Sequence, residues 1–148
     1  MLLLVMRHGA ATPLDTNDFD RVLTKAGIES VVRVCESLRE KQVNIERVIA
    51  SPLVRAQQTA TLVADRLVQG EPTMTWPEVS PFGECGLVAE MLGADPATTL
   101  VVTHQPFAGM LVEYLTGRTV SMGTATVVGI ESEILGKNSG EVIWVVRD

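Results

Sequence analysis

Cysteine and histidine are both scarce in this sequence of 148 residues, which holds two of each. Two cysteines, Cys35 and Cys85, are too few for a disulfide framework, and we therefore expect a reducing, cytoplasmic setting. Two histidines without a cysteine cluster lack the ligand set of a usual zinc site, so we expect neither a metal nor another cofactor. The motif G-x-x-x-x-G-K-[ST] is also absent from the sequence, which excludes a P-loop.

Long hydrophobic runs and an excess of positive charge are missing as well. The apolar run at residues 1–6 is too short for a signal-peptide core or a membrane span, and it predicts a buried strand instead. The net charge is −6, so we expect neither nucleic acid nor a membrane as a partner. The remaining composition, 46% hydrophobic and 20% charged, is that of an ordinary globular protein. The length fits one domain over residues 1–148.

Short apolar runs that alternate with helical patterns predict an α/β fold. Residues 2–6, 46–50 and 99–103 have the composition of buried strands, and a helical pattern follows each of them. This alternation predicts a three-layer sandwich with a mainly parallel central sheet and helices on both faces. Residues 124–134 and 141–146 are β-rich with turn residues between them, and they predict a C-terminal β-hairpin on one side of the sheet.

Three amphipathic patterns locate the expected helices. The first begins after the N-cap Thr24, the second with the cap and proline of Ser51-Pro52, and the third after Pro106. Residues 72–86 contain several prolines and glycines and predict a long irregular loop, a feature that is often functional. The residues expected to face the core are Ile28, Val31, Val32, Cys35 and Leu38, then Leu53, Ala56, Ala60, Val63 and Leu67, then Phe107, Met110, Leu111, Tyr114 and Leu115.

Both histidines directly follow predicted core strands. His8 comes after the first strand, between Arg7 and Gly9, and His104 comes after the third. In open α/β sheets the functional crevice lies beyond the carboxyl ends of the strands, so both side chains are expected at one edge. Arg55 is expected at the same edge, because it lies in the first turn of the helix after the second strand.

This combination of groups suits a phosphoryl group. Guanidinium groups match phosphate oxygens in a bidentate way, and the free amides of the helix opened by Gln105-Pro106 favour an anion. Gly9 lets the backbone turn close to a ligand. A neutral imidazole can attack phosphorus in line, and a protonated second imidazole would stabilise the phosphoryl oxygens. Taken singly, each histidine is more often structural and Arg55 more often solvated, but the repeated placement at strand ends favours catalysis.

The same segments resemble a known family, the histidine phosphatase (phosphoglycerate-mutase-like) superfamily. The resemblance runs in order through nearly the whole chain and implies the fold of that superfamily. Within it, residues 45–52, 77–83 and 86–88 are typical of the SixA-type protein phosphohistidine phosphatases. The motifs that carry the resemblance are Arg7-His8-Gly9, Leu23-Thr24-x-x-Gly27, Ser51-Pro52-Leu53-Val54-Arg55-Ala56-Gln57-Gln58-Thr59 and Val102-Thr103-His104-Gln105-Pro106.

The resemblance implies a role for each residue that matches the family's motifs. His8 would be the nucleophile that takes the phosphoryl group covalently. Arg7 and Arg55 would clamp the phosphoryl oxygens, and His104 would complete the pocket. Arg21 matches an arginine near the pocket rim. The further candidates for phosphate binding are Gly9, Ser51 and Gln105.

Two departures from the family concern the general acid. An acidic residue often follows the Arg-His-Gly motif, whereas this chain has Ala10. The middle loop, where relatives place an acid, offers only Glu78 and Glu84, and we interpret both as surface carboxylates rather than weak acids. An alkoxide needs a proton in order to leave, whereas the imidazole of a phosphohistidine can be protonated beforehand. A missing acid, and a chain too short for a cap over a small substrate, therefore favour phosphohistidine.

Three functions remain open at this point. The favoured one is a metal-independent phosphohistidine phosphatase that works through a covalent intermediate on His8. Its partner would be a phosphohistidine-bearing signalling protein, for example a histidine phosphotransfer domain. The second is a phosphomonoesterase that acts on a small phosphorylated metabolite. The third is a non-catalytic phosphoprotein-binding module, against which the two histidines weigh.

Overall fold

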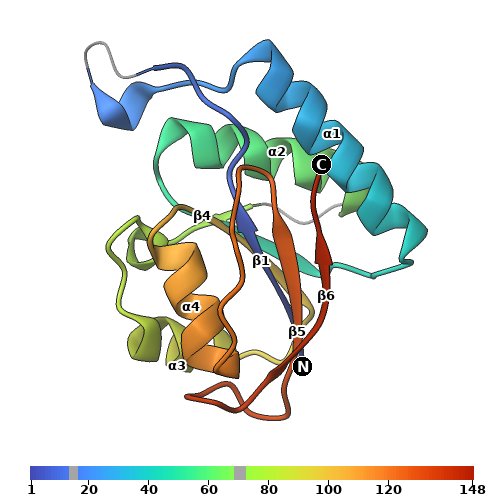
Figure 1. Ribbon diagram of the computed structural model, residues 1–148, viewed down its shortest axis with the longest axis vertical. Helices are drawn as coiled ribbons and strands as arrows, with labels where there is room; N and C mark the ends of the chain where they lie inside the picture. The colour runs from blue at the N-terminus through green and yellow to red at the C-terminus, as the bar shows by residue number, and fades with distance from the viewer. Residues whose placement is uncertain (14–16, 69–72) are drawn as a thin grey trace.

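The computed structural model describes residues 1–13, 17–68 and 73–148 of the chain. Its centre is a sheet of six strands in the order β3-β2-β4-β1-β5-β6, with helices on both sides (Figure 1). The strands are β1 (Leu2–Arg7), β2 (Arg47–Ala50), β3 (Met74–Thr75), β4 (Thr99–Thr103), β5 (Val127–Glu131) and β6 (Glu141–Val146). The helices are α1 (Lys25–Glu40), α2 (Val54–Leu67), α3 (Cys85–Gly93) and α4 (Phe107–Thr116), with short 3-10 helices η1 (Asp18–Asp20) and η2 (Pro77–Val79).

The sheet is parallel in its first four strands and antiparallel in its last two. β2 pairs in parallel with β3 and β4, and β4 pairs in parallel with β1. β5 runs antiparallel to β1 and to β6, which confirms the C-terminal hairpin. Arg7 lies opposite Thr103, and Ala50 lies opposite Val102. The carboxyl ends of β1, β2 and β4 therefore stand side by side at one edge.

Two hydrophobic cores fill the space on the two faces of the sheet. Side chains alternate along a strand, so Leu3 and Val5 of β1 enter one core while Leu4 and Met6 enter the other. The first core is completed by α3 and α4, and the second by α1 and α2. β4 is buried along its whole length because helices cover both of its faces. The predicted three-layer sandwich is confirmed.

The expected core-facing residues of the helices are partly wrong. Thr24 caps α1 as predicted, since its side chain accepts a hydrogen bond from the amide of Gly27. However, Ile28 is 42% exposed and Val32 only partly buried, while Val34 is buried in their place. The first turn of α1 packs with Gly27 against the backbone of Ala10. This orientation leaves the next residue, Ile28, facing the solvent. In α4, Met110 is likewise exposed.

The expected irregular loop at residues 72–86 also needs correction. It contains β3 and η2, and α3 begins at its end. Pro72 itself lies outside the described residues. Two residues were too few for a strand signal at β3, whereas α3 was missed because Gly86 and Gly93 lower its helical propensity. Thr103 Oγ1 donates a hydrogen bond to the carbonyl of Val79, so this segment is attached to the end of β4.

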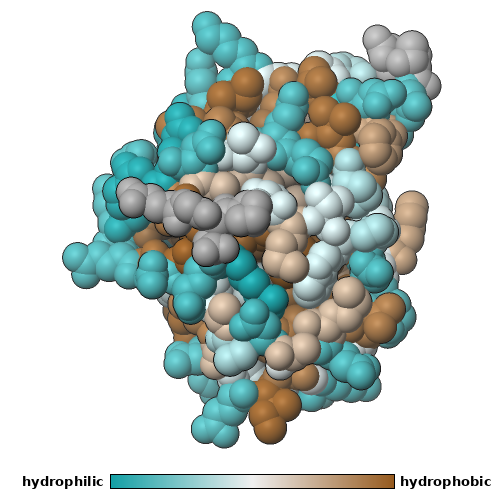
Figure 2. All heavy atoms as spheres, turned by 180° about the vertical axis from the view of Figure 1, so that it is seen from behind, coloured by the Kyte–Doolittle hydropathy of each residue, from teal (hydrophilic) through white to brown (hydrophobic). Residues whose placement is uncertain are grey.

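The surface mixes hydrophilic and hydrophobic side chains. On the face seen in Figure 2, hydrophobic residues reach the surface in patches between hydrophilic ones. Among the helices of the described residues, none is both long enough and apolar enough to cross a membrane.

Candidate active site

His8 stands at the carboxyl end of β1 with its side chain in a fixed orientation. Its amide donates a hydrogen bond to the carbonyl of Thr103 at 3.0 Å, which ties the residue to the end of β4. Its Nδ1 lies 2.7 Å from the carbonyl oxygen of Gly9, an atom that can only accept, so Nδ1 carries the proton. The unprotonated nitrogen is then Nε2, whose lone pair accepts a hydrogen bond from Arg55 Nε at 3.3 Å.

The surroundings of His8 favour the neutral imidazole. Burial, together with the charges of Arg55, Arg7 and Arg21, lowers the pKa of His8 to about 4, although the hydrogen bond to the Gly9 carbonyl acts in the opposite direction. The side chain is almost fully buried in a site lined with positive charge. At neutral pH His8 therefore holds a lone pair on Nε2 and no net charge, which is the form that a nucleophile needs.

His104 stands in the corresponding position at the end of β4. Its ring centroid lies 5.0 Å from that of His8. Its Nε2 is 2.7 Å from Ser51 Oγ, and burial together with the charges of His8 and Arg55 lowers its pKa to about 3. Among the described residues no group hydrogen-bonds its buried Nδ1. A buried polar atom without a partner is rare in a native protein, so this nitrogen is available to a ligand group.

Both histidines should therefore remain neutral well below the pH at which an exposed histidine becomes charged. We expect ¹⁵N NMR of the two imidazole rings to give titration midpoints below about pH 5, compared with roughly 6.5 for an unperturbed histidine. The sequence contains only these two histidines, so a His104→Asn variant assigns the remaining signals to His8. A midpoint near 6.5 for either ring would contradict the described burial.

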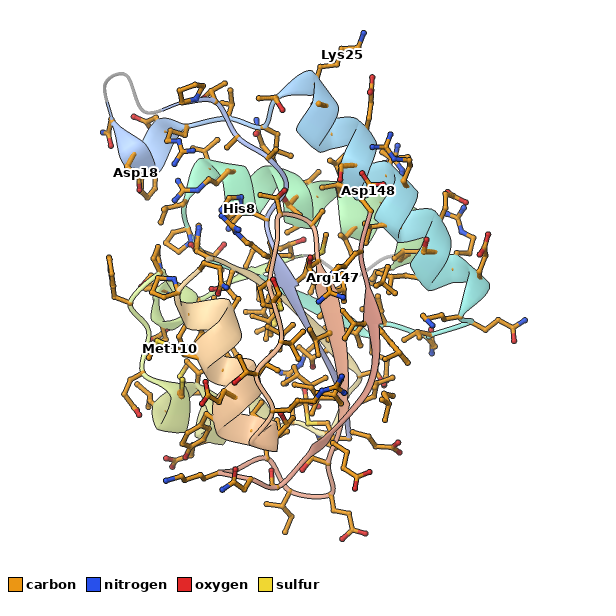
Figure 3. All side chains as sticks on the ribbon, viewed as in Figure 1. His8, Asp18, Lys25, Met110, Arg147 and Asp148 are labelled. Carbon is orange, nitrogen blue, oxygen red and sulfur yellow. The ribbon has the colours of Figure 1, made fainter. Side chains whose placement is uncertain are left out.

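The buried guanidinium of Arg55 connects His8 to Asp18. Its Nε faces His8 Nε2. Its Nη1 donates to the backbone carbonyl of Asp18 at 2.8 Å, and its Nη2 lies 3.4 Å from Asp18 Oδ2. Arg55 reaches this position because it lies in the first turn of α2, directly beyond the end of β2. Figure 3 shows His8 and Asp18 near the same end of the molecule.

Two more arginines surround the site. Arg7 donates from Nη1 to the carbonyl of Met122, while its buried Nε has no hydrogen-bond partner among the described residues. Burial and the charge of Arg55 lower the pKa of Arg7. Arg21 donates from Nε to the carbonyl of Thr12 and from Nη1 to Asp18 Oδ1 at 3.1 Å. The structure thus brings Arg21 and Arg55 together on the same carboxylate, while Arg7 keeps a donor available.

The backbone that carries His8 is held by tight packing against α1 and α2. The amide of Gly9 donates to Thr59 Oγ1, which in turn donates to the carbonyl of Arg55. A Cβ atom at Gly9 would lie 2.8 Å from Val31 Cγ2, and one at Gly27 would lie only 2.1 Å from the carbonyl oxygen of Ala10. Close approach of the backbone explains both glycines, and the amide of Gly9 is already occupied by Thr59. The phosphate-binding role expected of Gly9 stays a prediction, and it would require this amide to leave Thr59.

The other expected phosphate ligands have different partners. Ser51 is fully buried, and its hydroxyl contacts His104 and accepts a hydrogen bond from the amide of Leu53. Leu53 itself is the N-cap of α2, so Ser51 is not the cap that the sequence predicted. Gln105 Oε1 accepts from the amide of Gly109 within α4. Ser51 Oγ and Gln105 Oε1 thus have protein partners, and the phosphate-binding roles expected of both residues stay predictions.

The acidic candidates of the middle loop differ in their surroundings. Glu84 is exposed and caps α3, because its carboxylate accepts from the amides of Gly86 and Leu87. This contact agrees with its interpretation as a surface carboxylate. Glu78 lies partly buried in η2, the segment attached to the end of β4.

Two residues of the site were not among those predicted from the sequence. Asp18 lies in a polar segment without periodicity, and Thr59 is a polar residue within the apolar face of α2. The pKa of Asp18 is lowered, chiefly by its hydrogen bond to Arg21 and also by the charge and hydrogen bond of Arg55, while burial acts in the opposite direction. An ionised carboxylate cannot donate a proton, so Asp18 is not a general acid at neutral pH. The signals for Thr59 were its place at the end of the motif that begins with Ser51 and its position on the buried face of α2.

Comparison with known proteins places these residues in a family. The family model for the histidine phosphatase superfamily (branch 1) matches residues 3–80. The phosphohistidine phosphatase SixA of Escherichia coli (strain K12) is 36% identical over 133 residues, which cover 86% of this chain and 83% of that protein. A SixA homolog of Haemophilus influenzae is 28% identical over 98% of this chain and 99% of its own length.

Solved structures agree with this comparison. The structure of the protein histidine phosphatase SixA complexed with tungstate superposes with a TM-score of 0.90 at 32% identity, covering 99% of this chain and 97% of that one. A phosphoserine phosphatase from Entamoeba histolytica superposes with a TM-score of 0.73 at 14% identity, covering 99% and 97%, and shares the fold.

Proposed function

Because this chain belongs to the histidine phosphatase superfamily, with the SixA-type proteins among its relatives, we propose that it is a phosphohistidine phosphatase whose nucleophile is His8. The observation that carries this proposal is the state of His8, whose neutral Nε2 lone pair faces Arg55 in a buried, positively charged site. Such a nitrogen can attack phosphorus directly. The complex of the relative SixA with tungstate, a tetrahedral oxyanion, supports an anion pocket of this kind.

The proposed reaction has two displacements at phosphorus. In the first, the Nε2 lone pair of His8 forms a bond to phosphorus, and the bond to the leaving group breaks with its electron pair passing to the departing atom. In the second, a water oxygen attacks phosphorus, the bond to His8 Nε2 breaks, and its electron pair returns to the ring. The water's protons pass to the phosphate product and to solvent.

The remaining groups stabilise the negative charge on the phosphoryl oxygens. Arg55 and Arg7 supply guanidinium donors, and the unpartnered Arg7 Nε suits one oxygen. His104 Nδ1 is the second unpartnered atom, and the approach of a negative phosphoryl group raises the pKa of a neighbouring imidazole. His104 is then able to take up a proton and donate a hydrogen bond to the phosphoryl group, while Ser51 holds its other nitrogen.

The substrate that we propose is N-linked phosphate on a protein. Glu84 caps a helix, and Asp18 is ionised between two arginines, so neither supplies the proton that an alkoxide leaving group needs. The rim of the site is accessible, since the side chains of Asp18 and Arg21 are 52% and 26% exposed. A phosphohistidine on the surface of a signalling protein, such as a histidine phosphotransfer domain, fits a pocket with an accessible rim.

The test compares leaving groups on the purified protein. We expect kcat/KM for a phosphohistidine-bearing protein to exceed that for an alkyl phosphate by roughly 10²-fold or more, the usual contribution of a general acid. Equal values for the two substrates would favour the alternative, a phosphomonoesterase of small metabolites. In that case Glu78→Gln should slow the hydrolysis of alkyl phosphates and Glu84→Gln should not, because Glu84 is committed to capping α3.

A further inference from the structure

Asp18 is a negative charge fixed at the rim of a site that binds negative groups. Its two carboxylate oxygens are held by different arginines, Oδ1 by Arg21 at 3.1 Å and Oδ2 by Arg55 at 3.4 Å. Half of the side chain nevertheless remains exposed, so the carboxylate is both oriented and accessible. A single guanidinium, that of Arg55, separates it from His8 Nε2.

A carboxylate at this place has opposite effects on different leaving groups. It repels a leaving group that develops negative charge, such as a phenolate or alkoxide. It attracts the imidazole of a phosphohistidine, whose second ring nitrogen carries a proton and a positive charge before the bond to phosphorus breaks. In-line attack by His8 Nε2 directs the leaving group away from His8, on the side of Nε2 where Arg55 and, beyond it, Asp18 lie.

We infer, on the basis of the proposed function, that Asp18 determines specificity for N-linked phosphate by accepting a hydrogen bond from the protonated ring nitrogen of the departing imidazole. When the bond to phosphorus breaks, its electron pair passes to the nitrogen that carried the phosphoryl group. The ring then leaves as neutral imidazole and keeps the proton on its other nitrogen. No protein group gains or loses a proton in this step, so the lack of a general acid is no obstacle.

The variant Asp18→Asn isolates the charge of this residue. The amide oxygen can still accept from Arg21 or Arg55, and the backbone carbonyl that binds Arg55 Nη1 is unchanged. Asp20 provides a matched control, because it is exposed in the same short helix and Asp20→Asn changes the net charge equally. The two substrates are N-phosphoimidazole and p-nitrophenyl phosphate, which are both small and differ in the charge of their leaving groups.

We expect Asp18→Asn to lower kcat/KM for N-phosphoimidazole about tenfold, the usual effect of losing a charge-assisted hydrogen bond. The same variant should raise kcat/KM for p-nitrophenyl phosphate about two- to fivefold, because a repulsion is removed. Asp20→Asn should change neither value. A fall with both substrates would mean that Asp18 only supports Arg55, and a rise with both would mean that it only competes with phosphate for the arginines. Either outcome would overturn the inference.

The wild-type protein tests the proposed function separately. The ratio of its two kcat/KM values reports whether N-linked phosphate is preferred at all. The change of that ratio in Asp18→Asn reports what the carboxylate contributes to it. A failure of the proposed function is therefore distinguishable from a failure of the inference.

Discussion

The substitution His8→Asn should reduce phosphatase turnover on the order of 10⁴-fold, because it removes the nitrogen that we propose as nucleophile. Asparagine is the sharper choice than alanine. Its side-chain amide can replace Nδ1 as the donor to the Gly9 carbonyl, so that no buried acceptor loses its partner. It offers no lone pair in the place of Nε2. Loss of activity in a protein that retains its fold therefore reports on chemistry.

Steady-state rates and thermal unfolding of wild type and variant are the measurements. A brief reaction of the wild type with labelled substrate should also leave a phosphoryl group on His8 that is labile in acid and stable in base. His8→Asn should leave none. A variant that retains a few per cent of wild-type turnover would remove His8 from the nucleophile role and leave the covalent intermediate without support.

The second large effect is expected for Arg55→Lys, which retains the positive charge and loses the planar fork. We expect kcat/KM to fall on the order of 10²–10³-fold, the range found when one preorganised donor to a transition state is lost. The physical reason is geometric. One guanidinium contacts His8 through Nε and Asp18 through both terminal nitrogens, and a single ammonium group cannot reproduce these three directions.

Arg66→Lys is the matched control for Arg55→Lys. Arg66 lies in the last turn of the same helix α2, at the end away from the site, so the same exchange there should leave kcat/KM unchanged. If Arg55→Lys stayed within about threefold of wild type, positive charge alone would be sufficient, and the fork geometry of Arg55 would have no catalytic role.

The parts of the fold that the sequence could predict are those with strong local signals. The apolar runs of β1, β2 and β4 are short and bounded, and the hydroxyl of Thr24 is a recognisable cap for α1. Because parallel strands end at one edge, three correctly placed strands were enough to bring His8, Arg55 and His104 together. The roles of these residues remain predictions until the variants are measured.

The parts that the sequence could not predict depend on contacts between distant segments. Ser51 followed by proline has the pattern of a helix cap, but its hydroxyl bonds to His104, 53 positions further along the chain. In the sequence nothing distinguishes Asp18 from the other acidic residues. Only the structure shows that Arg21 and Arg55 bind its carboxylate. The pKa of His8 depends on how deeply the imidazole is buried and on the arginines that surround it, which a sequence motif does not give.

The contact between the loop of His8 and the first turn of α1 makes residues outside the site important for its geometry. Gly27 is buried in a helix and carries no chemistry, yet no side chain fits between it and the carbonyl of Ala10, two residues from His8. Thr24 Oγ1 and its amide both donate to that same carbonyl. Mutational tolerance at Gly27 should therefore follow that of the nucleophile itself. In laboratory evolution of the enzyme, the start of α1 belongs with the residues to be kept constant, while the exposed positions later in α1 can vary.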